Sequence, residues 1–187
     1  MAINYKKCPK CNSTNTGVIR YGEPNYMFPV DENIRFGGCS FSLDSPSYFC
    51  HECNHEWNRD EAINEAYSKI GTIIASVGGY FEGYYTVILD LDNKHVKWSF
   101  SLACEEVTTE KSIRTKTVTN FIEDLKSVHF LDWKAKYLDM DICDGTQWSV
   151  EIITSEKTIK KYGSNQFPKG WGLFCRGIRR ISGKPFK

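Results

Sequence analysis

The chain has 187 residues, of which 41% are hydrophobic and 25% are charged, so it carries enough apolar material for one or two packed cores and is not a disordered chain. The 24 Lys and Arg residues nearly balance the 23 Asp and Glu residues, and the net charge of +1 excludes a protein that attracts polyanions over its whole surface. No apolar run approaches the roughly 18 residues of a membrane span, and the first residues, MAINYKKCPK, lack the apolar stretch of a signal peptide. We therefore expect a soluble, cytoplasmic protein without a membrane partner.

The spacing of the cysteines carries the clearest chemical signal in the first third of the chain. Eight cysteines without a secretion signal favour metal ligands and free thiols over a disulfide framework. Four of them form two Cys-x-x-Cys pairs, Cys8 with Cys11 and Cys50 with Cys53. Two residues between thiolates allow a tight turn, a zinc knuckle, to direct both sulfurs at one ion, and two knuckles complete a closed tetrahedron. The pattern predicts a structural Zn²⁺ ion bound by these four cysteines. A redox-active or coincidental pairing is the alternative.

The residues beside the pairs agree with this interpretation. Asn12 and Asn54 follow the second cysteine of each pair, where a left-handed backbone is usual and Asn tolerates it. The pairs are farther apart than the roughly 15–20 residues of the simplest paired pattern, so we expect an inserted irregular loop with strands only near its ends. Such a loop could be a binding surface.

Three other residues near the pairs are secondary candidates for the metal site. His51 lies inside the second knuckle and His55 just after it, so either could replace a cysteine as a ligand, although solvated side chains are usual at these positions. Cys39 follows two glycines and could pack against the metal site. We expect it instead to be a small buried side chain.

Four short sequences lie within about residues 6 to 57: CPKCNST, RYG, GGC and SPSYFCHECNHEW. Together they resemble the zinc-ribbon beginning of many small uncharacterised bacterial proteins. The resemblance implies four zinc ligands, Cys8, Cys11, Cys50 and Cys53. It also implies that Trp57 packs beside the second knuckle. This chain has Asn12 and Asn54 where zinc ribbons usually have Gly. Zinc ribbons of this kind occur in proteins that act on nucleic acids and also in protein adaptors, so the fold does not decide the function.

The stretch after the cysteine pairs predicts a helix, three strands and a second helix. Asp60 is the expected N-cap of a short helix over residues 60–70, which Gly71 ends. Residues 71–102 are rich in β-branched and aromatic side chains and contain turn residues at two points, which indicates three strands. Apolar residues at helical spacing over residues 118–128 predict a helix that lies on a sheet.

The last third of the chain predicts a similar series of elements. Asp144-Gly145 is a strong hairpin signal, so we expect strands over residues 137–142 and 146–154 to pair around it. A third strand over residues 157–162 and a closing helix that begins near Trp171 follow. The stretch from DGTQWSVEI to KYGSNQFPKGW, within about residues 133 to 180, resembles the tail of domains in uncharacterised bacterial proteins, and this resemblance implies no activity.

The order strand, strand, strand, helix therefore occurs over residues 71–130 and again over residues 134–182, which makes an internal duplication a hypothesis. With or without it, we predict an α+β fold in which helices cover one face of a largely antiparallel sheet. The predicted organisation is a zinc ribbon with a long inserted loop over residues 1–59, a linker helix over 60–70 and an α+β domain over 71–187.

The charges are unevenly distributed along the chain. Residues 61–156 carry a net charge of −7, whereas residues 157–187 carry nine basic and no acidic residues. Aromatic residues are interleaved with these basic residues, a mixture that suits phosphate contacts and base stacking. One alternative is that the basic residues complement the acidic middle of the chain or the end of the closing helix. Another is that they bind an acidic protein partner. The candidate contacts to a nucleic acid or another partner are Lys160, Lys161, Arg176, Arg179 and Arg180.

Few residues suggest catalysis. His95 and His129 are the only histidines outside the ribbon, and neither is part of a nucleophile-and-base pattern. Asp139, Asp141 and Asp144 have part of the spacing of a calcium loop, but the sixth position lacks Gly and the twelfth lacks Glu. We therefore assign no catalytic residue.

The leading hypothesis is a non-enzymatic binding or adaptor protein, in which the zinc ribbon and the α+β domain recognise a protein or a nucleic acid. The first alternative is a nucleic-acid-binding protein that uses the basic C-terminal segment. The second is an enzyme whose site on the α+β domain has no recognisable motif.

Overall fold

The computed structural model describes residues 3–22, 31–139 and 145–187, and these residues form two compact units. The amino-terminal unit comprises residues 3–68, and the carboxy-terminal unit includes residues 69–187. Within the described residues, no helix is long and apolar enough to cross a membrane.

The amino-terminal unit contains a small sheet and one helix. Its strands have the order β2-β1-β3-β4, in which β1 pairs with β2 in parallel and with β3 in antiparallel orientation. The strands are β1 (Thr16–Arg20), β2 (Ile34–Phe36), β3 (Tyr48–Cys50) and β4 (Glu56–Trp57). Helix α1 (Arg59–Ser68) follows the last strand. A small buried cluster in this unit contains Cys8, Cys50, Trp57 and Ala62.

Helix α1 begins earlier than the sequence predicts. The backbone N–H of Glu61 donates a hydrogen bond of 2.8 Å to Oδ1 of Asn58, so Asn58 and not Asp60 is the N-cap. The helix ends at Ser68, and Gly71 lies within the next strand instead of ending the helix.

The carboxy-terminal unit is built on a seven-stranded sheet with the order β8-β7-β6-β5-β10-β11-β9. All neighbouring strands are antiparallel except β11 and β9, which are parallel. The strands are β5 (Ile70–Gly79), β6 (Gly83–Asp90), β7 (His95–Leu102), β8 (Glu105–Ser112), β9 (Lys136–Leu138), β10 (Gln147–Thr154) and β11 (Thr158–Ser164).

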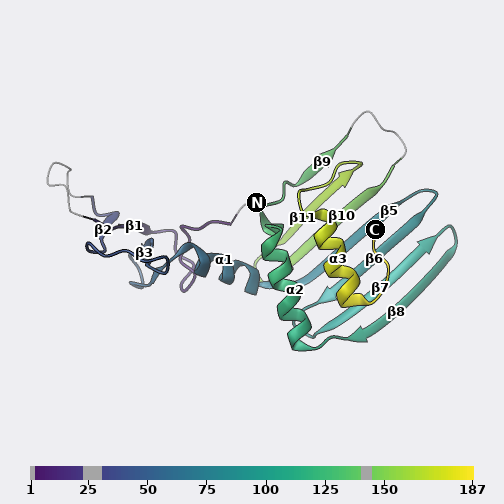
Figure 1. Ribbon diagram of the computed structural model, residues 1–187, viewed down its shortest axis with the longest axis horizontal. Coiled ribbons are helices and arrows are strands. Elements are labelled where there is room, and N and C mark those ends of the chain that lie inside the picture. The colour runs from purple at the N-terminus through teal and green to yellow at the C-terminus, as the bar shows by residue number, and fades with distance from the viewer. Residues whose placement is uncertain (1–2, 23–30, 140–144) are drawn as a thin grey trace. The chain divides into compact units, whose positions relative to one another are not determined.

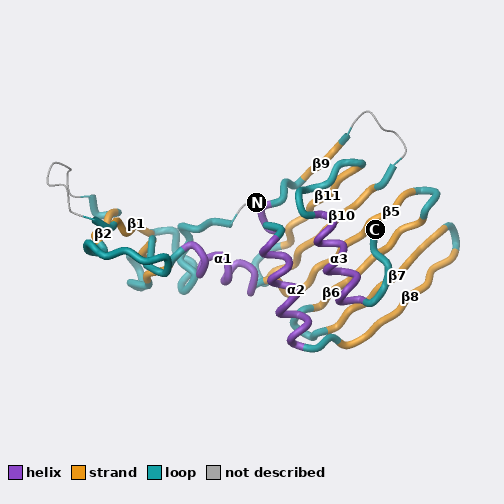
Figure 2. Tube along the Cα trace, in the orientation of Figure 1, coloured by secondary structure: helices purple, strands orange, loops and turns teal. Residues whose placement is uncertain are grey.

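Two helices, α2 (Thr115–Ser127) and α3 (Trp171–Ser182), lie on the same face of this sheet (Figures 1 and 2). The short 3-10 helix η1 (Phe130–Asp132) follows α2. Alternate residues of the central strands, such as Ile73 in β5 and Ile152 in β10, are fully buried. Helix α3 buries Phe174, Ile178 and Ile181, which recur at helical spacing and therefore face the sheet side of the helix. The unit is thus an α+β fold with its core between the helices and the sheet.

The three strands predicted over residues 71–102 are confirmed as β5, β6 and β7, but a fourth strand, β8, precedes α2. Strand β8 lies at the edge of the sheet, and seven of its eight residues are exposed. Its sequence, EEVTTEKS, therefore has no alternation of apolar and polar residues that would have predicted a strand. The strand-strand-strand-helix duplication stays a prediction.

The predicted hairpin around Asp144-Gly145 is wrong. Strand β9 pairs with β11 in parallel orientation, whereas β10 has β5 on one side and β11 on the other. Because both edges of β10 are paired along its length, β9 cannot pair with β10. Residues 140–144 lie outside the described residues.

Candidate functional site

The four paired cysteines come together in the amino-terminal unit. Their sulfur atoms all lie within 4.8 Å of one another. The Sγ atoms of Cys8 and Cys53 are 3.6 Å apart, and those of Cys11 and Cys50 are 3.5 Å apart. Sulfurs about 2.3 Å from one zinc ion at the corners of a tetrahedron lie roughly 3.8 Å apart, whereas a disulfide bond is about 2.05 Å long. The cluster therefore has the dimensions of a metal site.

Each cysteine pair is held by the same backbone hydrogen bonds. In the first turn, Asn12 N–H donates to the Cys8 carbonyl at 3.0 Å, and Cys8 N–H donates to the Ser13 carbonyl at 2.9 Å. In the second turn, the equivalent bonds join Asn54 to Cys50 at 3.0 Å and Cys50 to His55 at 2.9 Å. The predicted left-handed residues are confirmed, since φ is 61° at Asn12 and 53° at Asn54. Two equivalent turns thus bring two sulfurs each to one point.

The thiols of the cluster have different acidities. Burial raises the pKa of the Cys8 thiol. Burial acts in the same direction at Cys50, but the backbone N–H groups of Cys53 and Glu52 outweigh it and lower the pKa of that thiol to about 7. The lowered pKa favours the thiolate at Cys50, and the thiolate is the form that binds a metal ion.

The neighbouring candidates do not join the cluster. Among the described residues, the four cysteines form the one group of three or more His, Cys, Asp or Glu side chains that could hold a metal ion. His51 packs edge-on against the Phe49 ring, and its buried Nε2 has no hydrogen-bond partner among the described residues. Cys39 is exposed, so the expectation of a buried side chain is wrong. Trp57 packs in the buried cluster with Cys8 and Cys50, as the resemblance implies.

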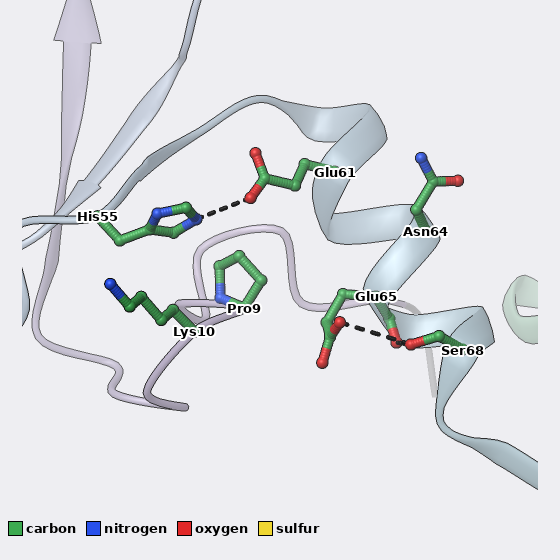
Figure 3. A pocket seen from close by; sticks show the side chains of 7 residues that line it. All are labelled: Pro9, Lys10, His55, Glu61, Asn64, Glu65 and Ser68. Atoms are coloured by element: carbon green, nitrogen blue, oxygen red, sulfur yellow. Dashed lines mark hydrogen bonds and ion pairs between the residues drawn. The ribbon is translucent and has the colours of Figure 1, made fainter.

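A hollow of about 390 Å³ lies between the first knuckle and α1 (Figure 3). Pro9 and Lys10 form one side, and Glu61, Asn64 and other residues of α1 form the opposite side. His55 Nε2 lies 2.7 Å from Glu61 Oε1 within this hollow. The contact links the second knuckle to the helix, so it supports the fold of the unit around the cysteines.

The structure separates the basic residues predicted to contact a partner. Lys160 is exposed on the face of the sheet that α2 and α3 do not cover, and its Nζ lies 2.8 Å from Glu151 Oε1. Lys161 points to the opposite face and is 1% exposed. Its Nζ donates hydrogen bonds to the backbone carbonyls of Leu131 and Trp133. This corrects the prediction for Lys161, because a buried ammonium that is already bound cannot contact a partner.

Arg176, Arg179 and Arg180 are all exposed on α3. Arg180 forms an ion pair with Asp124 of α2. The side chains of Arg176 and Arg179 form no hydrogen bond or ion pair with another described residue, which leaves uncompensated positive charge on the outer surface of this helix.

A second hollow, of about 460 Å³, lies in the carboxy-terminal unit where α2 ends and α3 begins. Its lining includes the apolar side chains of Val128 and Leu173 and the rings of Trp133 and Tyr137. No motif in the sequence predicts this hollow, because its residues come from separate segments. His129, which lines it, has a left-handed backbone with φ of 50°, a local feature that no pattern in the sequence indicates.

The two remaining sets of candidates do not form a site in the described residues. His95 lies on β7, 3.9 Å from Glu110 on the neighbouring strand. Asp139 lies just beyond β9, and the other two aspartates of the partial calcium pattern fall outside the described residues. No protein-family model matches this chain, and no curated protein is similar to it.

Proposed function

We propose that the protein is a non-enzymatic binding protein whose amino-terminal unit is a zinc ribbon. The observation that carries the proposal is the set of four cysteine sulfurs within 4.8 Å of one another. Four protein ligands fill the coordination shell of Zn²⁺ and leave no position for a water or a substrate, which is the pattern of structural sites and not of catalytic ones. Cys8, Cys11, Cys50 and Cys53 would hold the ion and stabilise a unit that has only a small apolar core.

Metal analysis of the purified protein tests this proposal. We expect a single zinc ion per chain and loss of the ion from a Cys8→Ser variant. Cys104→Ser is the matched control, because Cys104 is also a free cysteine but is exposed and outside the cluster. Full zinc binding by Cys8→Ser, or no zinc in the unaltered protein, would refute the zinc ribbon.

A separate observation favours nucleic acid as the partner. Arg176 and Arg179 project from α3 without an ion pair among the described residues, and Lys169 just before the helix is also exposed. The two acidic residues in the C-terminal half of α2 are neutralised, Asp124 by Arg180 and Glu123 by Lys126. The outer surface of the helix layer therefore keeps excess positive charge of the kind that binds phosphates.

Binding to short single-stranded and double-stranded nucleic acids across a range of salt tests this second proposal. Binding should fall steeply with added salt, and Arg176→Gln and Arg179→Gln should each lower the slope of log K against log salt by about one. Lys160→Gln is the control, because Lys160 lies on the uncovered face of the sheet and is paired with Glu151. Absence of binding at low salt would eliminate nucleic acid and leave a protein as the partner class.

A further inference from the structure

The hollow between the end of α2 and the start of α3 has a lining suited to a flat, uncharged group. The ring of Tyr137 and the side chain of Leu173 contribute apolar surface, and Trp133, which is 5% exposed, closes part of the wall. Leu173 is 47% exposed although it is apolar, so part of this surface faces solvent. The volume of about 460 Å³ is within the range of pockets that bind small molecules or single chemical groups.

Polar side chains of both signs also line the hollow. Asp132 is acidic, Lys169 is basic, and His129 can donate or accept a hydrogen bond. A lining with both a carboxylate and an ammonium suits a neutral group with its own donors and acceptors better than it suits an ion. Nucleobases combine a flat apolar face with donors and acceptors along their edges.

The hollow is continuous with the exposed basic residues of α3. Leu173 lines the hollow, and Arg176 follows one helical turn later on the exposed surface of the same helix. Lys169 precedes the helix and lies at the hollow itself. A strand whose phosphates contact these cations would have its bases beside the hollow.

We propose that this hollow receives one unstacked base of a single-stranded nucleic acid, while Lys169 and Arg176 contact the adjacent phosphates. The inference rests on the proposed binding of nucleic acid and adds the kind of strand that is bound. A base within a duplex is stacked and paired on both sides and cannot enter the hollow without being flipped out. The protein therefore binds single strands more tightly than duplexes of the same sequence.

The test uses the full zinc-loaded protein and three labelled ligands at fixed salt: a short oligothymidylate, a fully abasic strand of equal length, and a duplex. Binding is measured by fluorescence anisotropy. Base–aromatic stacking contributes about 1–3 kcal/mol, so the oligothymidylate should bind about 5-fold to 150-fold more tightly than the abasic strand. The comparison is repeated with Leu173→Ala and with Leu102→Ala, a control at another apolar residue of comparable exposure, 41%.

Leu173→Ala should reduce the preference for the strand that carries bases, and Leu102→Ala should leave it unchanged. If the abasic strand and the duplex bind as tightly as the oligothymidylate, or if both leucine variants behave alike, the base-binding hollow is refuted while the basic surface stands. If none of the three ligands binds, the proposed nucleic-acid function itself fails.

Discussion

Gly177 of α3 lies directly against the ring of Phe121 of α2. A Cβ atom at this position would come within 3.1 Å of Cε2 and 3.3 Å of Cδ2 of that ring. Phe121 is 2% exposed, so its ring is enclosed by neighbouring groups. The absence of a side chain at Gly177 therefore sets how closely the two helices pack.

Replacement of Gly177 by Ala should destabilise the carboxy-terminal unit. Glycine inside a helix costs about 0.5–1 kcal/mol relative to Ala, but overpacking of a filled core costs about 1–3 kcal/mol. The second effect should exceed the first because the ring of Phe121 has little room to move. We expect the free energy of unfolding in urea to fall by about 1 kcal/mol in Gly177→Ala.

Gly172 provides the control on the same helix. A Cβ atom there would meet nothing within 4 Å, so Gly172→Ala should stabilise the protein by up to about 1 kcal/mol through helix propensity alone. Equal effects of the two substitutions would show that Phe121 and its neighbours do not restrict this position.

The parts of the fold that depend on adjacent residues could be predicted from the sequence. Both cysteine turns are examples, because their geometry is determined by two sulfurs, two intervening residues and an Asn that tolerates a positive φ. The closing helix is another, since Phe174, Ile178 and Ile181 repeat at helical spacing and α3 places all three in the core.

The parts that depend on distant pairing could not be predicted. Asp144-Gly145 has the composition of a tight hairpin, but β5 and β11 occupy both edges of β10. The basic segment predicts a surface position for Lys161, but this side chain is buried. The alternation of side chains along a strand could have predicted this burial. Lys160 and Lys161 are neighbours in one strand, so they point to opposite faces and one of the two must face the helices.

Removal of zinc should unfold the amino-terminal unit and leave the carboxy-terminal unit folded. Trp57 is the only tryptophan of the first unit, and its indole N–H donates to the Tyr5 carbonyl at 2.9 Å. On addition of a chelator, the indole N–H signal of Trp57 in an NMR spectrum should move to its unfolded position. The signals of the four other tryptophans should remain, because those residues belong to the second unit.

Cys53→Ser should produce the same spectrum as the chelator without any addition. Cys39→Ser should keep the folded signal of Trp57, because Cys39 is exposed and outside the cluster. A zinc-free Cys53→Ser protein with an unchanged Trp57 signal would show that the ion does not hold this unit together.

The left-handed residue after the second knuckle should control zinc affinity. Asn54 has a φ of 53°, a conformation that costs most non-glycine residues about 1–2 kcal/mol. Asn54→Val should therefore weaken zinc binding by about tenfold, whereas Asn54→Gly should bind zinc at least as well as the unaltered protein. Competition with a chromophoric chelator measures both. Equal affinities of the Val and Gly variants would show that the backbone conformation is not required for binding.

Lys161 should give the carboxy-terminal unit a distinctive dependence on pH. Burial lowers the pKa of its ammonium group from 10.5 to about 8, although the nearby carboxylate of Asp132 opposes the shift. Between about pH 8 and pH 10.5 the unfolded chain therefore binds more protons at this residue than the folded chain does. The contribution of Lys161 to the free energy of unfolding rises with pH in this interval, by at most about 1.4 kcal/mol per pH unit, and is constant below it.

Urea unfolding at several pH values across this interval, followed by tryptophan fluorescence, measures the effect. All other titratable groups are common to the variants, so the comparison is between the slopes of the free energy of unfolding against pH. In Lys161→Met, the free energy of unfolding should lack the increase with pH that Lys161 contributes. Lys160→Met should retain this increase because Lys160 is exposed. Since Met cannot donate to the carbonyls of Leu131 and Trp133, the variant is expected to be less stable at high pH. Parallel profiles for the unaltered protein and Lys161→Met would mean that the buried ammonium has the same pKa in the folded and unfolded chains.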